Sequence, residues 1–119
     1  MGLADNCEDK PAESFAAMAL KDGVLRGLSD CGLLTPSLLQ RRLVGRIAAM
    51  RDVLVCAPNG SGKTAAYSIG LLQNIDADQP CCQALVLVPS RERAANVNIF
   101  IQRLGVPAFP HGSNLAKHS

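Results

Sequence analysis

One stretch of the sequence has the residue types and the spacing needed to bind phosphate. It reads Ala57-Pro58-Asn59-Gly60-Ser61-Gly62-Lys63-Thr64. Phosphate oxygens need several converging donors, and the two glycines let the backbone curl so that successive N–H groups face inward. Lys63 adds a point charge that reaches the β- and γ-phosphates, and the Thr64 hydroxyl can ligate Mg²⁺. The stretch predicts a polyphosphate site. The alternative is an ordinary glycine-rich turn with a stray lysine, since Ala57 stands where the pattern G-x-x-x-x-G-K-T begins with glycine.

The strands and helices predicted around this loop decide whether its backbone N–H groups point at one phosphate. Residues 53–57 form a short apolar run with two β-branched residues, typical of a buried strand, and 65–75 have helical spacing of apolar residues. A second strand at 84–88 and a helix at 91–104 repeat the order. Strand, helix, strand, helix predicts a parallel α/β layer with a right-handed crossover, and the phosphate loop lies at the start of its first helix.

Upstream, the pattern predicts two further helices. Apolar residues at near-helical spacing cover about 20–28, and Gly32 is the expected stop. A helix at 36–50 follows, with Thr35 as the expected N-cap and proline in its first turn. We expect residues 1–14 to be a mobile lead-in and 105–119 to be largely irregular.

Composition narrows the class of protein. The chain has 119 residues, 48% of them hydrophobic, so a buried core is expected, whereas a net charge of +2 is too mild to predict nucleic-acid binding by itself. The five cysteines are odd in number and form no C-x-x-C pair, which argues against a disulfide framework or a zinc site. Reduced thiols favour an intracellular location, cytoplasmic or nuclear. No signal peptide or apolar run long enough for a membrane span is evident.

Three motifs in order resemble one family. The alanine-first loop resembles motif I of superfamily-two helicases, the stretch Gly32 to Gln40 resembles the Q motif of DEAD-box proteins, and the stretch Pro89 to Ala94 resembles motif Ia. The chain is most similar to DEAD-box RNA helicases of the translation-initiation-factor-4A type. The resemblance covers residues 15–114 and leaves 115–119 as a tail. It implies a partial RecA-like parallel sheet flanked by helices, within an incomplete domain.

The resemblance also assigns nucleotide contacts. It implies that ATP and Mg²⁺ are bound and that Gln40 reads adenine, because a side-chain amide offers a donor and an acceptor side by side. The alternative for Gln40 is one exposed polar residue on an amphipathic helix. Leu33 replaces the family's phenylalanine, and Phe15 is the family's upstream aromatic or a core residue. The implied ATP-binding set is Phe15, Leu33, Gln40, Asn59, Gly60, Ser61, Gly62, Lys63 and Thr64, with Thr64 reaching Mg²⁺ through the nucleotide.

The same resemblance implies weak contacts to the RNA backbone. They would come from Pro89, Ser90, Arg91 and Gly112, and the alternative for Arg91 is a solvated residue at a helix start. The chain departs from the family here. Arg93 replaces a leucine, and we expect a charge there to disturb helix packing. His111 replaces the first glycine of a doublet, and the stretch between Pro89 and His111 is short.

Carboxylates are scarce where the chemistry would need them. No Asp or Glu follows Glu92, so an Asp-Glu-Ala-Asp box is absent from this chain. Because phosphoryl transfer needs carboxylates to hold Mg²⁺ and position water, we expect nucleotide binding without turnover and assign no catalytic residue. Two alternatives stay open, a stand-alone regulatory fragment and an unrelated P-loop nucleotidase or kinase. Unpaired strand edges lead us to expect that the missing helicase portion or a partner protein is needed for stability.

Overall fold

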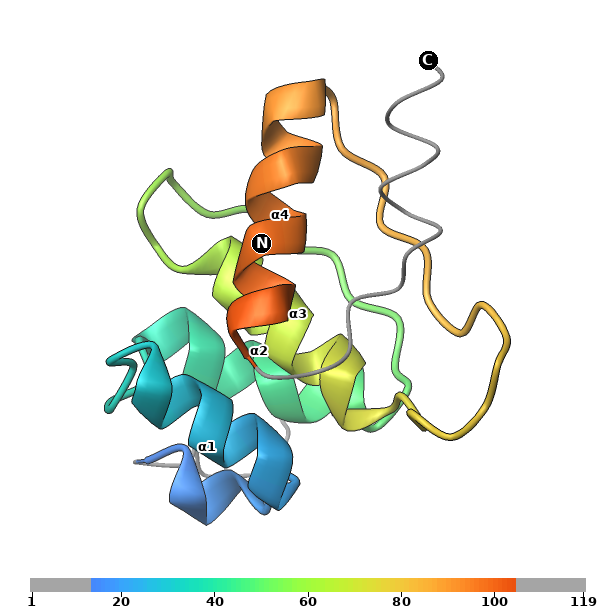
Figure 1. Cartoon of the computed structure of the whole chain (residues 1–119). Coiled ribbons are helices and arrows are strands. Elements are labelled where there is room, and N and C mark those ends of the chain that lie inside the picture. The colour runs from blue at the N-terminus through green and yellow to red at the C-terminus, as the bar shows by residue number, and fades with distance from the viewer. Residues whose placement is uncertain (1–13, 105–119) are drawn as a thin grey trace.

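The computed structural model describes residues 14–104 and contains helices in this range (Figure 1). A short 3-10 helix, η1, spans Ala16–Met18, and the α-helices are α1 (Asp22–Asp30), α2 (Leu38–Ala48), α3 (Lys63–Gln73) and α4 (Arg91–Arg103). Helices are therefore confirmed at all four predicted places. The predicted lead-in at 1–14, except for residue 14, and the irregular stretch at 105–119 lie outside the described residues.

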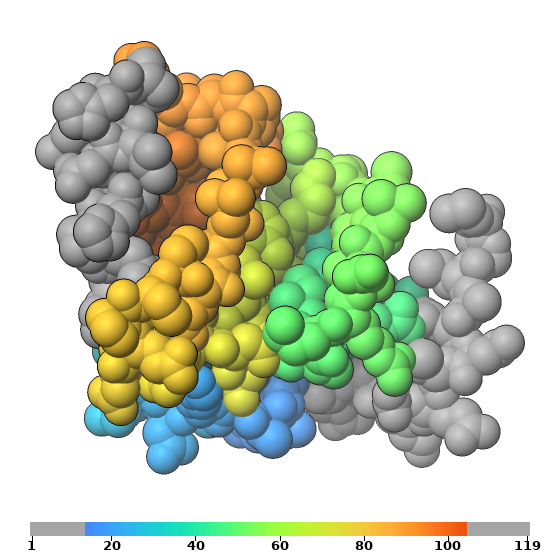
Figure 2. Space-filling view, turned by 90° about the vertical axis from the view of Figure 1, so that its right-hand side faces the viewer, coloured from blue at the N-terminus to red at the C-terminus, as the bar shows by residue number. Residues whose placement is uncertain are grey.

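The two predicted strands are not strands. Residues 53–57 and 84–88 have no strand pairing, and within residues 14–104 no main-chain hydrogen bond joins the two segments. A strand exists only through a hydrogen-bonded neighbour, and here part of α3 lies between the segments on the face shown in Figure 2. Leu54 is 93% exposed and Leu87 is 85% exposed, so the prediction that these runs are buried is also wrong. The expected parallel sheet is thus absent from the described residues.

The packing of α2 against α3 forms the centre of the molecule. Val44 from α2 and Ala66 and Ile69 from α3 are completely buried between them. Close approach depends on Gly70, because a Cβ added there would lie 2.7 Å from both Cβ and Cγ2 of Ile47 on α2. This contact fixes the start of α3, and with it the phosphate loop, relative to α2.

Helix α1 is attached to the C-terminal end of α3 and to the C-terminal end of α4. At its start, the Lys21 backbone N–H donates to Gln73 Oε1 at 2.8 Å, and Lys21 Nζ donates to the Ile75 carbonyl at 2.7 Å. Further along, Gly27 lies against the main chain of Leu104, where an added Cβ would collide with the carbonyl group. Leu104 is fully buried, so the end of α4 is held in the core.

The helix ends follow local sequence signals, with one correction. After α1, Gly32 takes φ +74°, its N–H donates to the Ser29 carbonyl, and the Leu33 N–H donates to the Leu28 carbonyl. This is a Schellman ending, which confirms Gly32 as the stop. The predicted N-cap Thr35 is wrong, because the N-cap of α2 is Ser37, which forms a capping box with the side chain three residues later. No helix among the described residues is long and apolar enough to cross a membrane.

Candidate functional site

The phosphate loop lies where the sequence predicted it, directly before α3. Gly60 has φ +83° and Gly62 has φ +90°, a region that other residues enter only at a cost, so both glycines are needed for the path of the backbone. Gly62 is the N-cap of α3 and provides no side-chain hydrogen bond to the first turn. The free N–H groups and positive dipole end of α3 are therefore available to an anion.

The loop is held closed by its own carbonyl groups. Lys63 Nζ donates to the Ala57 carbonyl at 2.6 Å, and the Ser61 hydroxyl donates to the Pro58 carbonyl at 2.6 Å. The ammonium group thus sits against main-chain dipoles rather than in bulk water. A phosphate entering the loop exchanges the Ala57 carbonyl for a stronger, charge-assisted acceptor.

Gln40 is buried and attached to the phosphate loop. Its side chain is 6% exposed, which rules out the alternative of an exposed polar residue. Its Oε1 accepts from the Ser37 N–H at 2.9 Å, and its Nε2 donates to the Gly62 carbonyl at 3.4 Å. The Ser37 hydroxyl donates to the Ser61 carbonyl at 3.1 Å. Two hydrogen bonds therefore join the start of α2 to the loop that would hold the phosphates.

Ser37 is a site residue that our sequence reasoning passed over. The signal was present, because Ser37 followed three residues later by Gln40 has the spacing of a capping box. The fit at Gly62 is tight, since an added Cβ would lie 2.6 Å from Gln40 Nε2 and 3.1 Å from Ser37 Oγ. Glycine is thus favoured at this position by its φ angle, and any larger residue would displace the Gln40 amide from its place beside the loop.

The two apolar residues assigned to the nucleotide, Phe15 and Leu33, both pack in or against the hydrophobic core. Phe15 is 4% exposed and belongs to the core cluster, which confirms its core role. Leu33 is half-buried and packs on the same cluster. A nucleotide contact by either side chain remains a prediction.

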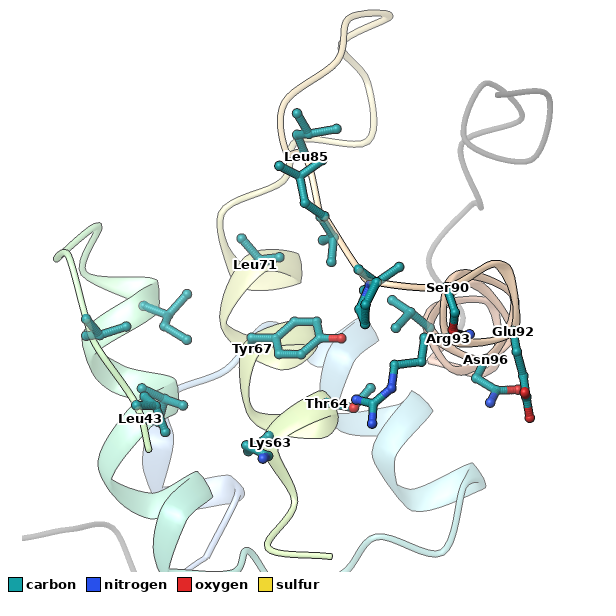
Figure 3. Close-up of a pocket in the computed structure, with 18 residues that line it drawn as sticks. Leu43, Lys63, Thr64, Tyr67, Leu71, Leu85, Ser90, Glu92, Arg93 and Asn96 are labelled. Carbon is teal, nitrogen blue, oxygen red and sulfur yellow. Dashed lines mark hydrogen bonds between the residues drawn. The ribbon is translucent and has the colours of Figure 1, made fainter. Parts of the chain in front are cut away.

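A groove of about 950 Å³ opens beside the loop (Figure 3). Lys63, Thr64, Tyr67 and Leu71 from α3 line its floor. The segment 53–55 lies on one side with Leu43 of α2, and 85–90 lies on the other with the first turns of α4. Apolar side chains line most of the groove, whereas its end at Thr64 is polar.

Two of the four residues assigned to RNA lie at this groove. Pro89 and Ser90 line it, and the Ser90 hydroxyl accepts from the Arg93 N–H at 3.2 Å, which caps α4. Arg91 is exposed at the first position of the helix. Gly112 and His111 lie outside the described residues. The structure thus brings three of the four assigned residues together.

Arg93 is the second residue that our sequence reasoning misjudged. It appeared only as a departure that would disturb packing, yet it is exposed and lines the groove with Lys63 and Thr64. Of the carboxylates that the structure describes, Glu92 alone lines the groove, and Figure 3 shows its side chain directed away from Thr64. Within residues 14–104, no three His, Cys, Asp or Glu side chains gather into a metal-binding group.

Comparison with known proteins identifies the family. The family model described as DEAD/DEAH box helicase matches residues 37–114. The chain is 43% identical over 96 residues to the ATP-dependent RNA helicase FAL1 of Candida glabrata, covering 81% of this chain and 24% of that protein. It is 39% identical over 104 residues to eukaryotic initiation factor 4A of Caenorhabditis elegans, covering 87% of this chain and 26% of that protein.

Solved structures agree with this assignment. A Saccharomyces cerevisiae Dbp5 variant bound to a Gle1 variant and IP6 matches with a TM-score of 0.76 and 28% identity, over 82% of this chain and 25% of the other. A DEAD box protein from Methanococcus jannaschii matches with a TM-score of 0.75 and 25% identity, over 82% and 27%. The chain spans about a quarter of the length of these relatives. The helices are thus arranged as in part of a RecA-like helicase domain, although no sheet is formed among residues 14–104. The alternative of an unrelated P-loop enzyme is excluded, and the chain belongs to the DEAD/DEAH box helicase family, of which it represents part of the helicase domain.

Proposed function

We propose that this chain binds ATP together with Mg²⁺, with the polyphosphate in the loop from Asn59 to Thr64. The observation that carries the proposal is the pair of hydrogen bonds from Ser37 and Gln40 to the loop carbonyls. These bonds place a side-chain amide suited to adenine beside the amides suited to phosphate. One nucleotide could therefore reach both groups.

Each residue of the loop has a separate role in this proposal. The uncapped N–H groups at the start of α3 and the ammonium of Lys63 bind phosphate oxygens. The exposed hydroxyl of Thr64 is free to join the coordination of Mg²⁺, which when bound neutralises phosphate charge. Gln40 keeps its hydrogen bond from the Ser37 N–H. It reads the base with the N–H donor and the oxygen lone pair that its hydrogen bonds within the protein leave unused. Leu33, which is half-buried, contributes apolar contact to the base, while Phe15 supports it from the core.

We further propose that the bound nucleotide is not turned over. Among residues 14–104, Glu92 is the only carboxylate lining the groove, and it does not face Thr64. Hydrolysis needs a positioned water and stabilisation of charge on the transferred phosphoryl group, and no residue lining the groove is placed for the first task.

RNA contact is proposed for the rim of the same groove. The Arg91 guanidinium, with Pro89, Ser90 and Gly112, would bind backbone phosphates without reading sequence, so binding would weaken as salt is raised.

The exposed leucines of 53–57 and 84–88 suggest that a partner or the remaining helicase portion covers them. We place the protein in the cytoplasm or nucleus.

Calorimetric titration of the full chain tests the proposal. Mg·ATP and Mg·ADP are expected to bind and Mg·GTP to bind more weakly, and Lys63→Ala should weaken Mg·ATP binding at least about 10-fold by removing a charge-assisted contact. Arg26→Ala is the matched control, since Arg26 is an exposed cation on α1, remote from the loop. Folded protein that takes up no adenosine nucleotide, or phosphate release above that of Lys63→Ala, would contradict the proposal.

A further inference from the structure

The groove contains a second cation that the proposed function does not use. Arg93 lies in the first turn of α4 and lines the same groove as Lys63 and Thr64. Figure 3 shows its side chain extending from α4 toward Thr64 at the start of α3. Its backbone N–H caps the helix through Ser90, while its guanidinium has no hydrogen-bond or salt-bridge partner among residues 14–104. The group is therefore free to take a ligand.

The charges around this end of the groove favour an anion. Within the described part of the chain, Lys63 and Arg93 are the two cations that line it, and the single carboxylate, Glu92, is directed away. Two positive groups next to the dipole end of α3 repel each other unless negative charge lies between them. A guanidinium also presents parallel N–H donors that match two oxygens of one phosphate.

We propose that Arg93 is a second cationic ligand of the bound nucleotide, and that it recognises the outermost phosphate. This inference rests on the proposed function, since it needs a polyphosphate in the loop. Lys63 and the amides of α3 hold the β- and γ-phosphates from one side, and Arg93 reaches the terminal γ-phosphate from α4 on the other. The chain therefore distinguishes a triphosphate from a diphosphate by whether the nucleotide has a terminal phosphate within reach of Arg93.

A consequence concerns the divalent cation. A protein-borne guanidinium near the terminal phosphate supplies part of the charge neutralisation that Mg²⁺ supplies when bound. ATP binding by this chain is consequently less dependent on Mg²⁺ than binding by a variant with leucine, the residue that the family resemblance places at this position. The substitution at position 93 is thereby part of the site rather than a packing defect.

The test compares nucleotide affinity in wild type, Arg93→Leu and Arg93→Gln, with and without EDTA. Both variants should bind ATP about 10- to 100-fold more weakly, bind AMP unchanged, and show a larger loss on removing Mg²⁺ than wild type does. Arg93→Gln keeps most of the side-chain length and polarity, which guards against loss of the fold. Arg103→Leu is the control, since it removes an exposed cation from the last turn of the same helix.

The outcomes separate the two claims. If wild type binds ATP and Lys63→Ala does not, but both Arg93 variants bind ATP within twofold of wild type, this inference fails and the proposed function stands. If the Arg93 variants lose affinity for a single-stranded RNA oligonucleotide and keep it for ATP, Arg93 is an RNA ligand and the inference is overturned. If folded wild type binds no adenosine nucleotide, the proposed function itself fails.

Discussion

Replacing Gly70 by alanine tests how closely α2 and α3 must approach. The new Cβ would lie 2.7 Å from Cβ and Cγ2 of Ile47, well inside ordinary van der Waals contact. The Ile47 Cβ is bonded directly to the backbone of α2, so relief requires the two helices to move apart rather than one side chain to rotate. Overpacking of this kind costs about 1–3 kcal/mol. Alanine also favours the helix over glycine by about 1 kcal/mol, which partly hides the cost.

Gly45→Ala removes that ambiguity. Gly45 lies in α2 and a Cβ added there meets nothing within 4 Å, so the substitution brings the helix gain without the collision. The difference in free energy of unfolding between the two variants therefore isolates the steric cost, and we expect Gly45→Ala to be more stable by about 1–3 kcal/mol. Urea unfolding followed by circular dichroism measures it. If Gly70→Ala unfolds at the same urea concentration as Gly45→Ala, the α2–α3 contact is not as close as described.

Three further predictions follow from helix ends and the loop. Gly27→Ala should destabilise the protein by about 1–3 kcal/mol in urea unfolding, because its Cβ meets main chain at the end of α4, whereas Gly23→Ala, with open space, should not; equal effects would contradict this packing. Met50→Gly should raise the thermal midpoint, because Met50 has φ +61° at the Schellman end of α2 and its side chain is 78% exposed; a lower midpoint would count against it. Gln40→Glu keeps an acceptor for the capping box but loses the donor to Gly62 and buries a carboxylate beside the Gly62 carbonyl, so both the thermal midpoint and the ATP affinity of the folded protein should fall; unchanged affinity would remove Gln40 from the site.

Local signals were enough to predict the helices and the loop. Glycine at 60 and 62, lysine at 63 and an apolar stripe behind them define a helix start wherever they occur, and the Gly32 stop depends on one left-handed residue. These features involve contacts three to six residues apart. Sequence spacing therefore describes them without knowledge of the rest of the fold.

The strands and the groove could not be predicted in the same way. An apolar run such as 84–88 becomes a strand only when another segment supplies hydrogen bonds, and among the described residues no segment does. The direction of Arg93 depends on how α4 docks against α3, which no local pattern specifies. The hydrogen bonds from Ser37 and Gln40 to the loop span more than twenty residues, although the capping box behind them was readable.

The central claim is that the amides at the start of α3 bind a polyphosphate. Titration of ¹⁵N-labelled protein with ATP measures this most directly, because each backbone N–H reports its own environment. We predict that the amide signals of residues 59–64 shift together and saturate, while those of α1 around Gly23 remain in place. Binding that leaves the amides of 59–64 unmoved, or shifts only signals outside the loop and α2, would contradict the account.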